Sequence, residues 1–185
     1  NKDLKKKKKD DNKKPEKKNE YDELIKKGGT VKKGLFIVRH IEDKWYFEVP
    51  DSIIGRYLLA VTRLTAVPQG LGKFSGEEVN ENTLYFEKRD DNTLLLRAYV
   101  LSQLAGDDTN ISKTLKASTI DPIVASFKII GKNKDKHMNL VEVTSLFLKD
   151  NDIVSIPKNN SRTYGVSGLQ SDRTYIDTMK VFPIN

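Results

Sequence analysis

Short apolar runs between residues 34 and 64 are separated by Glu42-Asp43 and by Pro50-Asp51-Ser52, and this pattern predicts three β-strands in succession. Residues 35–41 and 44–49 flank Glu42 and Asp43, a separation that suits a tight hairpin turn. In the second run the apolar residues that share one face are Trp45, Phe47 and Val49. The pattern predicts a fold built from antiparallel hairpins.

A corner and a third strand follow the hairpin. Pro50 closes the second run, and Asp51 and Ser52 are residue types that cap a short helical turn. The next strand is expected over residues 56–64, with apolar side chains on both of its faces: Tyr57, Leu59 and Val61 on one, Leu58, Ala60 and Leu64 on the other. A strand that is apolar on both faces is typical of the centre of a sheet, so we place it there.

Four more strands and three short helices complete the expected elements. The strands are predicted over residues 83–89, 93–101, 123–130 and 139–143, and the helices over residues 21–27, 110–118 and 144–148. Asn110 and Thr144 are the expected caps of the last two helices. Residues 175–182 fit a strand or a helix. The predicted fold is mainly β: an antiparallel, hairpin-built sandwich or curved sheet with two or three short helices.

The positive charge of the chain is confined to its beginning. The formal net charge is +7, and residues 1–33 hold 14 lysines against seven acids, which leaves the remainder neutral. We interpret residues 1–20 as a disordered, Lys-rich tail or linker, because they contain a single apolar side chain, Leu4. Basic residues confined to a tail do not form a nucleic-acid-binding face, so we expect no nucleic-acid partner and only weak contact of the tail with a membrane surface.

Motifs that carry chemistry are missing from the sequence. The two histidines, His40 and His137, lie far apart in the chain, and the absence of Cys excludes disulfides and thiolate metal sites. Gly72 and Lys73 are followed by Phe74, where a phosphate-binding Walker loop needs Ser or Thr. Three pairs of acids fall where Asp is a common turn former: Asp90 and Asp91, Asp107 and Asp108, Asp150 and Asp152. The sequence therefore predicts no catalytic, cofactor-binding or metal-binding residue.

We divide the chain into three parts. Residues 1–20 are the tail, residues 21–65 a short helix-plus-hairpin module, and residues 66–185 a β-rich domain. The last residues have neither a helix cap nor a polar tail, so we expect this domain to be truncated at its C-terminus. Contacts with a partner are expected first in the glycine-rich loop 69–78 and in the polar segment 159–173.

Residues 20–64 resemble the short N-terminal domain of a family of large bacterial zinc-dependent metalloproteases that are secreted or located in the envelope. The motifs that carry the resemblance are Tyr21 with Leu24, the strand 33–38, the Tyr-Phe-Glu-x-Pro-Asp-Ser segment 46–52, and the Gly-Arg-x-Leu-Leu segment 55–59. Three later segments resemble the start of the following uncharacterised domain of these proteins: residues 80–86, 121–127 and 172–185.

The resemblance implies that the chain is the non-catalytic N-terminal region of an exported zinc metallopeptidase, in the periplasm, on the outer membrane surface or secreted. Its expected partner is the catalytic domain of the same protein, which carries the HExxHxxGxxH zinc motif; that motif is missing from this chain, so no zinc is expected in it. On this basis the segment itself is not expected to be an enzyme. The alternative is a stand-alone exported module that binds a protein or a glycan.

Overall fold

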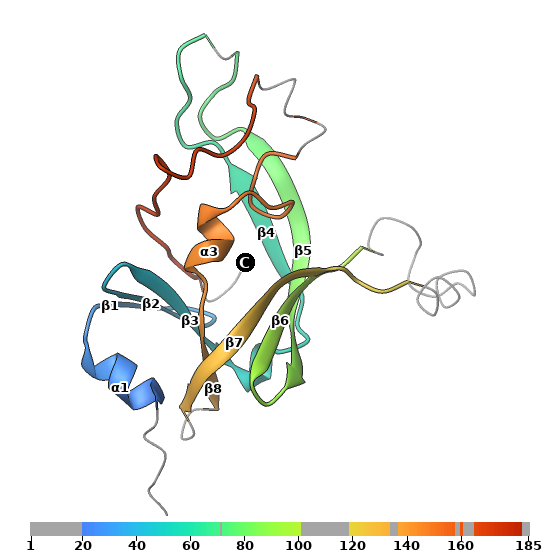
Figure 1. Ribbon diagram of the computed structural model, residues 1–185. Coiled ribbons are helices and arrows are strands. Elements are labelled where there is room, and N and C mark those ends of the chain that lie inside the picture. The colour runs from blue at the N-terminus through green and yellow to red at the C-terminus, as the bar shows by residue number, and fades with distance from the viewer. Residues whose placement is uncertain are drawn as a thin grey trace, which may run out of the picture.

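The computed structural model of the protein describes residues 20–70, 72–100, 119–133, 137–157, 160 and 165–182. It is one antiparallel, eight-stranded sheet in the order β1-β2-β3-β8-β7-β6-β5-β4 (Figure 1). The elements are α1 (Glu20–Lys26), β1 (Thr30–Lys33), β2 (Ile37–Ile41), β3 (Lys44–Pro50), η1 (Asp51–Ile53), β4 (Leu58–Arg63), β5 (Glu78–Asp90), β6 (Thr93–Ala98), β7 (Ile123–Asn133), β8 (Met138–Glu142) and α3 (Thr144–Leu148). The mainly β, antiparallel prediction is confirmed, in the form of a single curved sheet.

Both predicted hairpins are present. The turn between β2 and β3 puts Glu42 at a φ of 55°, the left-handed conformation that a two-residue hairpin turn requires. The second hairpin joins β5 to β6, and its Leu84 and Phe86 point into the core. Strand β1 was not predicted; it pairs with β2 from Thr30 to Lys33 and carries little apolar surface.

Strand β7 joins the two halves of the sheet. Its residues 123–128 pair with β6, and its residues 129–133 pair with β8, with a register shift between Ile129 and Gly131. Strand β3 continues the sheet beyond β8, with Phe47 opposite Val141. Strands from residues 30–63 therefore stand at both ends of the sheet, and strands from residues 78–142 lie between them.

The main core lies on the face of the sheet that α3 covers (Figure 1). Side chains of all four central strands meet there, together with Leu146 of α3 and Ile153 after it. The helix predicted over residues 144–148 is present, but Thr144 does not cap it: Thr144 Oγ1 accepts a hydrogen bond from Trp45 N at 2.9 Å. The predicted Thr144 cap is wrong because the Thr144 hydroxyl is hydrogen-bonded to the backbone N–H of Trp45 in β3.

The segment 175–182 is neither strand nor helix. It is an extended chain whose Ile176, Met179 and Val181 pack against the core. Leu35 N donates a hydrogen bond to Phe182 O at 3.3 Å, and a Cβ at Gly34 would lie only 1.9 Å from Val181 O. Close backbone approach thus explains the glycine at position 34.

A second, smaller core lies beneath α1. It consists of Tyr21, Ile41, Tyr46 and Leu140. The polar-looking face of β3 is therefore buried too, and Glu48 on that face is only 1% exposed. It accepts a hydrogen bond from the Tyr21 hydroxyl at 3.0 Å and pairs with Arg39.

The corner after β3 differs from its prediction. The turn is the 3₁₀ helix η1, which begins at Asp51 and has no side-chain cap. The Asp51 carboxylate instead accepts a hydrogen bond from Asn139 Nδ2 at 2.7 Å, so it joins the turn to β8. The expected tail and the helix capped by Asn110 lie outside the described residues, apart from Glu20.

Strand β4 is not central. It is the last strand of the sheet and pairs with β5 alone among the described strands. Its side chains alternate between half-buried and exposed, so one of its two apolar faces is open to solvent. The prediction of a central strand is wrong. Apolar side chains on both faces of a strand suggest that both are buried, but they do not show which elements, if any, cover each face.

Candidate functional site

The side chains that could carry catalysis are dispersed. His40 stacks on Trp45 with ring centroids 4.3 Å apart, whereas His137 lies in the turn before β8. Within the described residues, no three His, Asp or Glu side chains group closely enough to hold a metal ion. In the same part of the chain, no helix is long and apolar enough to cross a membrane.

The acid pairs that the structure describes serve turns and ion pairs. Asp90 accepts a hydrogen bond from Asn92 N at 2.8 Å, and such backbone donors lower the pKa of the Asp90 carboxyl. Asp91 lies 3.4 Å from Lys132, and Asp150 accepts a hydrogen bond from Leu169 N at 2.9 Å. Asp107 and Asp108 lie outside the described residues.

The glycine-rich loop folds on itself. Lys73 pairs with Glu77 at 2.6 Å, and the Ser75 hydroxyl donates to Thr65 O at 2.7 Å. Phe74 is its one large exposed side chain among those described. Of the segment 159–173, the structure describes residues 160 and 165–173, which are mostly exposed. The structure does not test whether either segment contacts a partner.

A patch of aromatic and aliphatic side chains lies on one face of β4 and of the strands next to it in the sheet. Tyr57 is 60% exposed, Leu59 48% and Val61 38%, all on or just before β4. We call this patch the tyrosine face; its members are Tyr57, Leu59, Val61, Tyr85, Tyr99 and Ile123. Sequence analysis grouped the first three on one face of a strand but assigned that face to the interior.

The rings of the tyrosine face hold one another in place. Tyr57 lies 4.6 Å from Tyr99 and 5.8 Å from Tyr85, measured between ring centroids. Tyr85 stands opposite Arg97 in the register, and Arg97 stands opposite Ile123. The patch therefore continues across four neighbouring strands, and its rings already sit in fixed positions.

Polar groups border the tyrosine face and are themselves paired. The Tyr85 hydroxyl donates to Asp121 Oδ2 at 3.0 Å, and Arg97 donates to Asp121 O at 2.6 Å and to Glu87 Oε1 at 3.3 Å. Burial, followed by this hydrogen bond to Asp121, raises the pKa of Tyr85 to about 12. The hydroxyl is thus a fixed hydrogen-bond donor at neutral pH and not an acid–base group.

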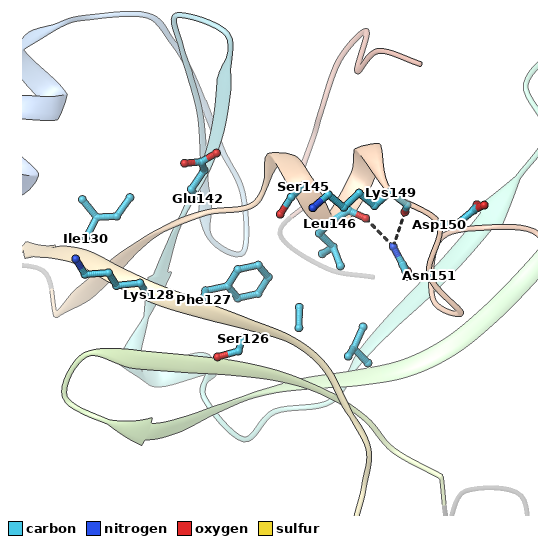
Figure 2. A pocket seen from close by; sticks show the side chains of 12 residues that line it. Ser126, Phe127, Lys128, Ile130, Glu142, Ser145, Leu146, Lys149, Asp150 and Asn151 are labelled. Carbon is cyan, nitrogen blue, oxygen red and sulfur yellow. Dashed lines mark hydrogen bonds between the residues drawn. The ribbon is translucent and has the colours of Figure 1, made fainter. Parts of the chain in front are cut away.

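A groove of about 560 Å³ opens between β7 and α3 (Figure 2). Its floor is apolar, because Phe127 of β7 and Leu146 of α3 belong to the main core. We call it the β7–α3 groove. Its lining residues are Val124, Ala125, Ser126, Phe127, Lys128, Ile130, Glu142, Ser145, Leu146, Lys149, Asp150 and Asn151.

The helical wall of this groove is held by Asn151. Its Nδ2 donates to Leu146 O at 2.7 Å and to Lys149 O at 3.0 Å, which satisfies carbonyl groups at the end of α3 (Figure 2). Sequence reasoning did not find this groove. It arises where β8 leaves β7, a separation that no local pattern in either strand reveals.

Two family models match the chain. Residues 76–185 match the model described as Domain of unknown function (DUF5117), and residues 18–67 match the model described as Domain of unknown function (DUF5118). The first match covers more than half of the chain. No curated protein and no solved structure matches the chain.

Proposed function

The chain belongs to the family described as Domain of unknown function (DUF5117), and we propose, from the sequence resemblance of residues 20–64, that it is a non-catalytic accessory region of a zinc-dependent metallopeptidase. In this proposal it docks on the peptidase domain of the same protein and supports that domain. The observation that carries the proposal is the tyrosine face, an apolar patch that is open to solvent at the β4 end of the sheet.

An open patch of this kind favours a docking surface. Exposed aromatic and aliphatic side chains that continue across several strands are typical of protein interfaces, whereas single exposed apolar residues are common everywhere. Tyr57 and Tyr85 add large contact areas that are already ordered, so little side-chain entropy is lost when a partner covers them. Burial by a neighbouring domain would also shield the free edge of β4 from pairing with other chains.

The kind of partner comes from the sequence resemblance. The motifs around Tyr21, Glu48 and Gly55 resemble those of the N-terminal domain of exported bacterial zinc metalloproteases. In such a protein the zinc and its ligands belong to the peptidase domain, and the proposed location is the periplasm, the outer membrane surface or the medium. This chain would then contribute a surface and no reacting group.

The experiment begins with the coding sequence that follows Asn185. The proposal expects it to continue into a segment with an HExxH zinc motif. That segment, produced separately, should bind the 185-residue chain in calorimetry. A stop codon in place of it would contradict the proposal and favour the alternative of a stand-alone exported module for a protein or glycan.

A further inference from the structure

Part of strand β7 has a partner on one side only. Residues 123–128 pair with β6, while pairing with β8 is confined to residues 129–133. Past Glu142 the chain turns away from β7 into α3. Among the described strands, none pairs with the second edge of residues 124–127, and this edge forms one wall of the β7–α3 groove.

Backbone groups of this edge point into the groove. Ile129 N donates to Asn92 O at 2.7 Å, so the polar groups of Ile129 point toward the β5–β6 hairpin. Backbone groups of successive residues point to opposite sides of a strand. The N–H and C=O groups of Ser126 therefore point away from β6, toward the side where β8 has left.

The dimensions of the groove suit an extended chain. Its strand wall spans residues 124–128, or roughly 13 Å at the usual rise of a β-strand. The opposite wall is formed by α3 and the residues after it, and Phe127 and Leu146 form an apolar floor between the walls (Figure 2). A strand edge facing a helix across an apolar floor is the arrangement that binds peptides by strand addition.

The charge around the groove selects among peptides. Three lysines, Lys44, Lys128 and Lys149, stand at the groove or beside it, against two carboxylates. Glu142 is paired with Lys44 at 3.0 Å, and Asp150 accepts a hydrogen bond from Leu169 N. Neither Lys128 nor Lys149 forms an ion pair with any acid of the described residues. Both ammonium groups are exposed and can meet carboxylates of a ligand.

We infer that the β7–α3 groove binds an extended, acidic peptide segment of a partner protein, which adds to the free edge of β7 as a further strand. Backbone hydrogen bonds to Ser126 supply the alignment, and the lysines supply the preference for acidic side chains. The inference uses other residues than the tyrosine face and stands without the proposed peptidase domain.

The test is a selection of random octapeptides displayed on phage, against the 185-residue chain and in parallel against Ser126→Pro. Proline removes the N–H that points into the groove, and it is tolerated on a strand edge. Acidic peptides rich in β-branched residues should be enriched on the wild type. The strongest synthetic peptide should bind Ser126→Pro about tenfold more weakly by fluorescence anisotropy, as expected for one lost backbone hydrogen bond and the added ring.

Matched variants separate edge pairing from charge. Ser126→Ala keeps the N–H and should bind like the wild type, as should Lys33→Glu, which reverses an exposed charge on β1. The double variant Lys128→Glu/Lys149→Glu should lose the acidic peptides. In the wild type, bound peptide should slow hydrogen exchange at the amide of Ser126, a readout that does not depend on any variant folding.

Three results would overturn the inference. The first is that selection on the wild type enriches only peptides that Ser126→Pro also enriches. The second is selected peptides that bind the charge-reversed variant as well as the wild type. The third is bound peptide that leaves hydrogen exchange at the Ser126 amide unchanged.

Discussion

The hydroxyl of Tyr21 donates a 3.0 Å hydrogen bond to Glu48 Oε2, and this contact fastens helix α1 to the middle of strand β3. Glu48 is almost fully buried and also pairs with Arg39 of the neighbouring strand. Asn133 Nδ2 donates to the same tyrosine oxygen at 3.2 Å, so the contact reaches β7 as well. One side chain of a short helix thus joins strands from both matched segments of the chain.

Replacing Tyr21 with Phe should destabilise the fold by about 1–2 kcal/mol, because a buried carboxylate loses one of its donors. Urea unfolding followed by circular dichroism measures the difference. Tyr175→Phe is the control, since Tyr175 is largely exposed and its replacement should change stability by less than about 0.5 kcal/mol. Equal effects of the two substitutions would show that the Glu48 contact does not stabilise the fold.

High pH should weaken the fold through Tyr85. Its pKa is raised to about 12 in the folded chain from an ordinary value of 10.0, so the folded state holds the proton more tightly than the unfolded state. The resulting stability is fully present below about pH 10 and is lost as the pH rises toward 12.

Tyr85→Phe tests this dependence. Unfolding free energies of the variant and the wild type, measured between pH 8 and pH 11, should converge as the pH rises. Tyr175→Phe, whose ring is largely exposed, should run parallel to the wild type over the same range. A constant gap between Tyr85→Phe and the wild type would mean that the Tyr85 proton is not held by the fold.

Gly34→Ala should destabilise the chain by about 1–3 kcal/mol, because the new Cβ would overlap Val181 O and push the extended segment 175–182 off the core. The amide of Leu35, which donates to Phe182 O, should then exchange faster with solvent. Gly55→Ala is a useful comparison: it has open space but a φ of +80°, so its cost of about 1 kcal/mol comes from backbone strain alone. Unchanged exchange at Leu35 in Gly34→Ala would contradict the packing described for this segment.

The segments that match the two family models should not fold apart. β3 pairs with β8, and β4 pairs with β5, so each of the two pieces loses a strand neighbour along two of its edges. Residues 18–67 and 76–185, produced separately, should each lack the cooperative unfolding transition of the whole chain in calorimetry. A sharp transition in either piece alone would show that the single sheet is not one cooperative unit.

Short-range patterns predicted the strands well. The period-two runs around Glu42 and around Asp90 became hairpins, because a turn of two or three residues between alternating strands leaves little freedom in register. Cap predictions at Asp51 and Thr144 failed, since Asn139 and Trp45 bond to these side chains across the sheet. Asp and Thr side chains can bond to several partners, and tertiary contacts that the local sequence does not contain decide which partner they bond to.

The candidate sites could be predicted only in part. Sequence analysis identified Tyr57, Leu59 and Val61 as one apolar face, but the position of β4 at the end of the sheet depends on strand order. The β7–α3 groove depends on where β8 leaves β7, near Val141, and on the placement of α3. Residues 175–182 fit the period of a strand and that of a helix, so the extended conformation in which Met179 packs on the core could not be foreseen.

Calorimetric binding of the chain to the proposed peptidase domain tests the proposed function most directly. The double variant Tyr57→Ser/Leu59→Ser should bind at least about tenfold more weakly than the wild type, because two exposed anchors of the tyrosine face are lost. Tyr175→Ser, which removes an exposed ring outside the tyrosine face, should bind like the wild type. Wild-type affinity in the double variant, or no binding by the wild-type chain, would contradict docking through the tyrosine face.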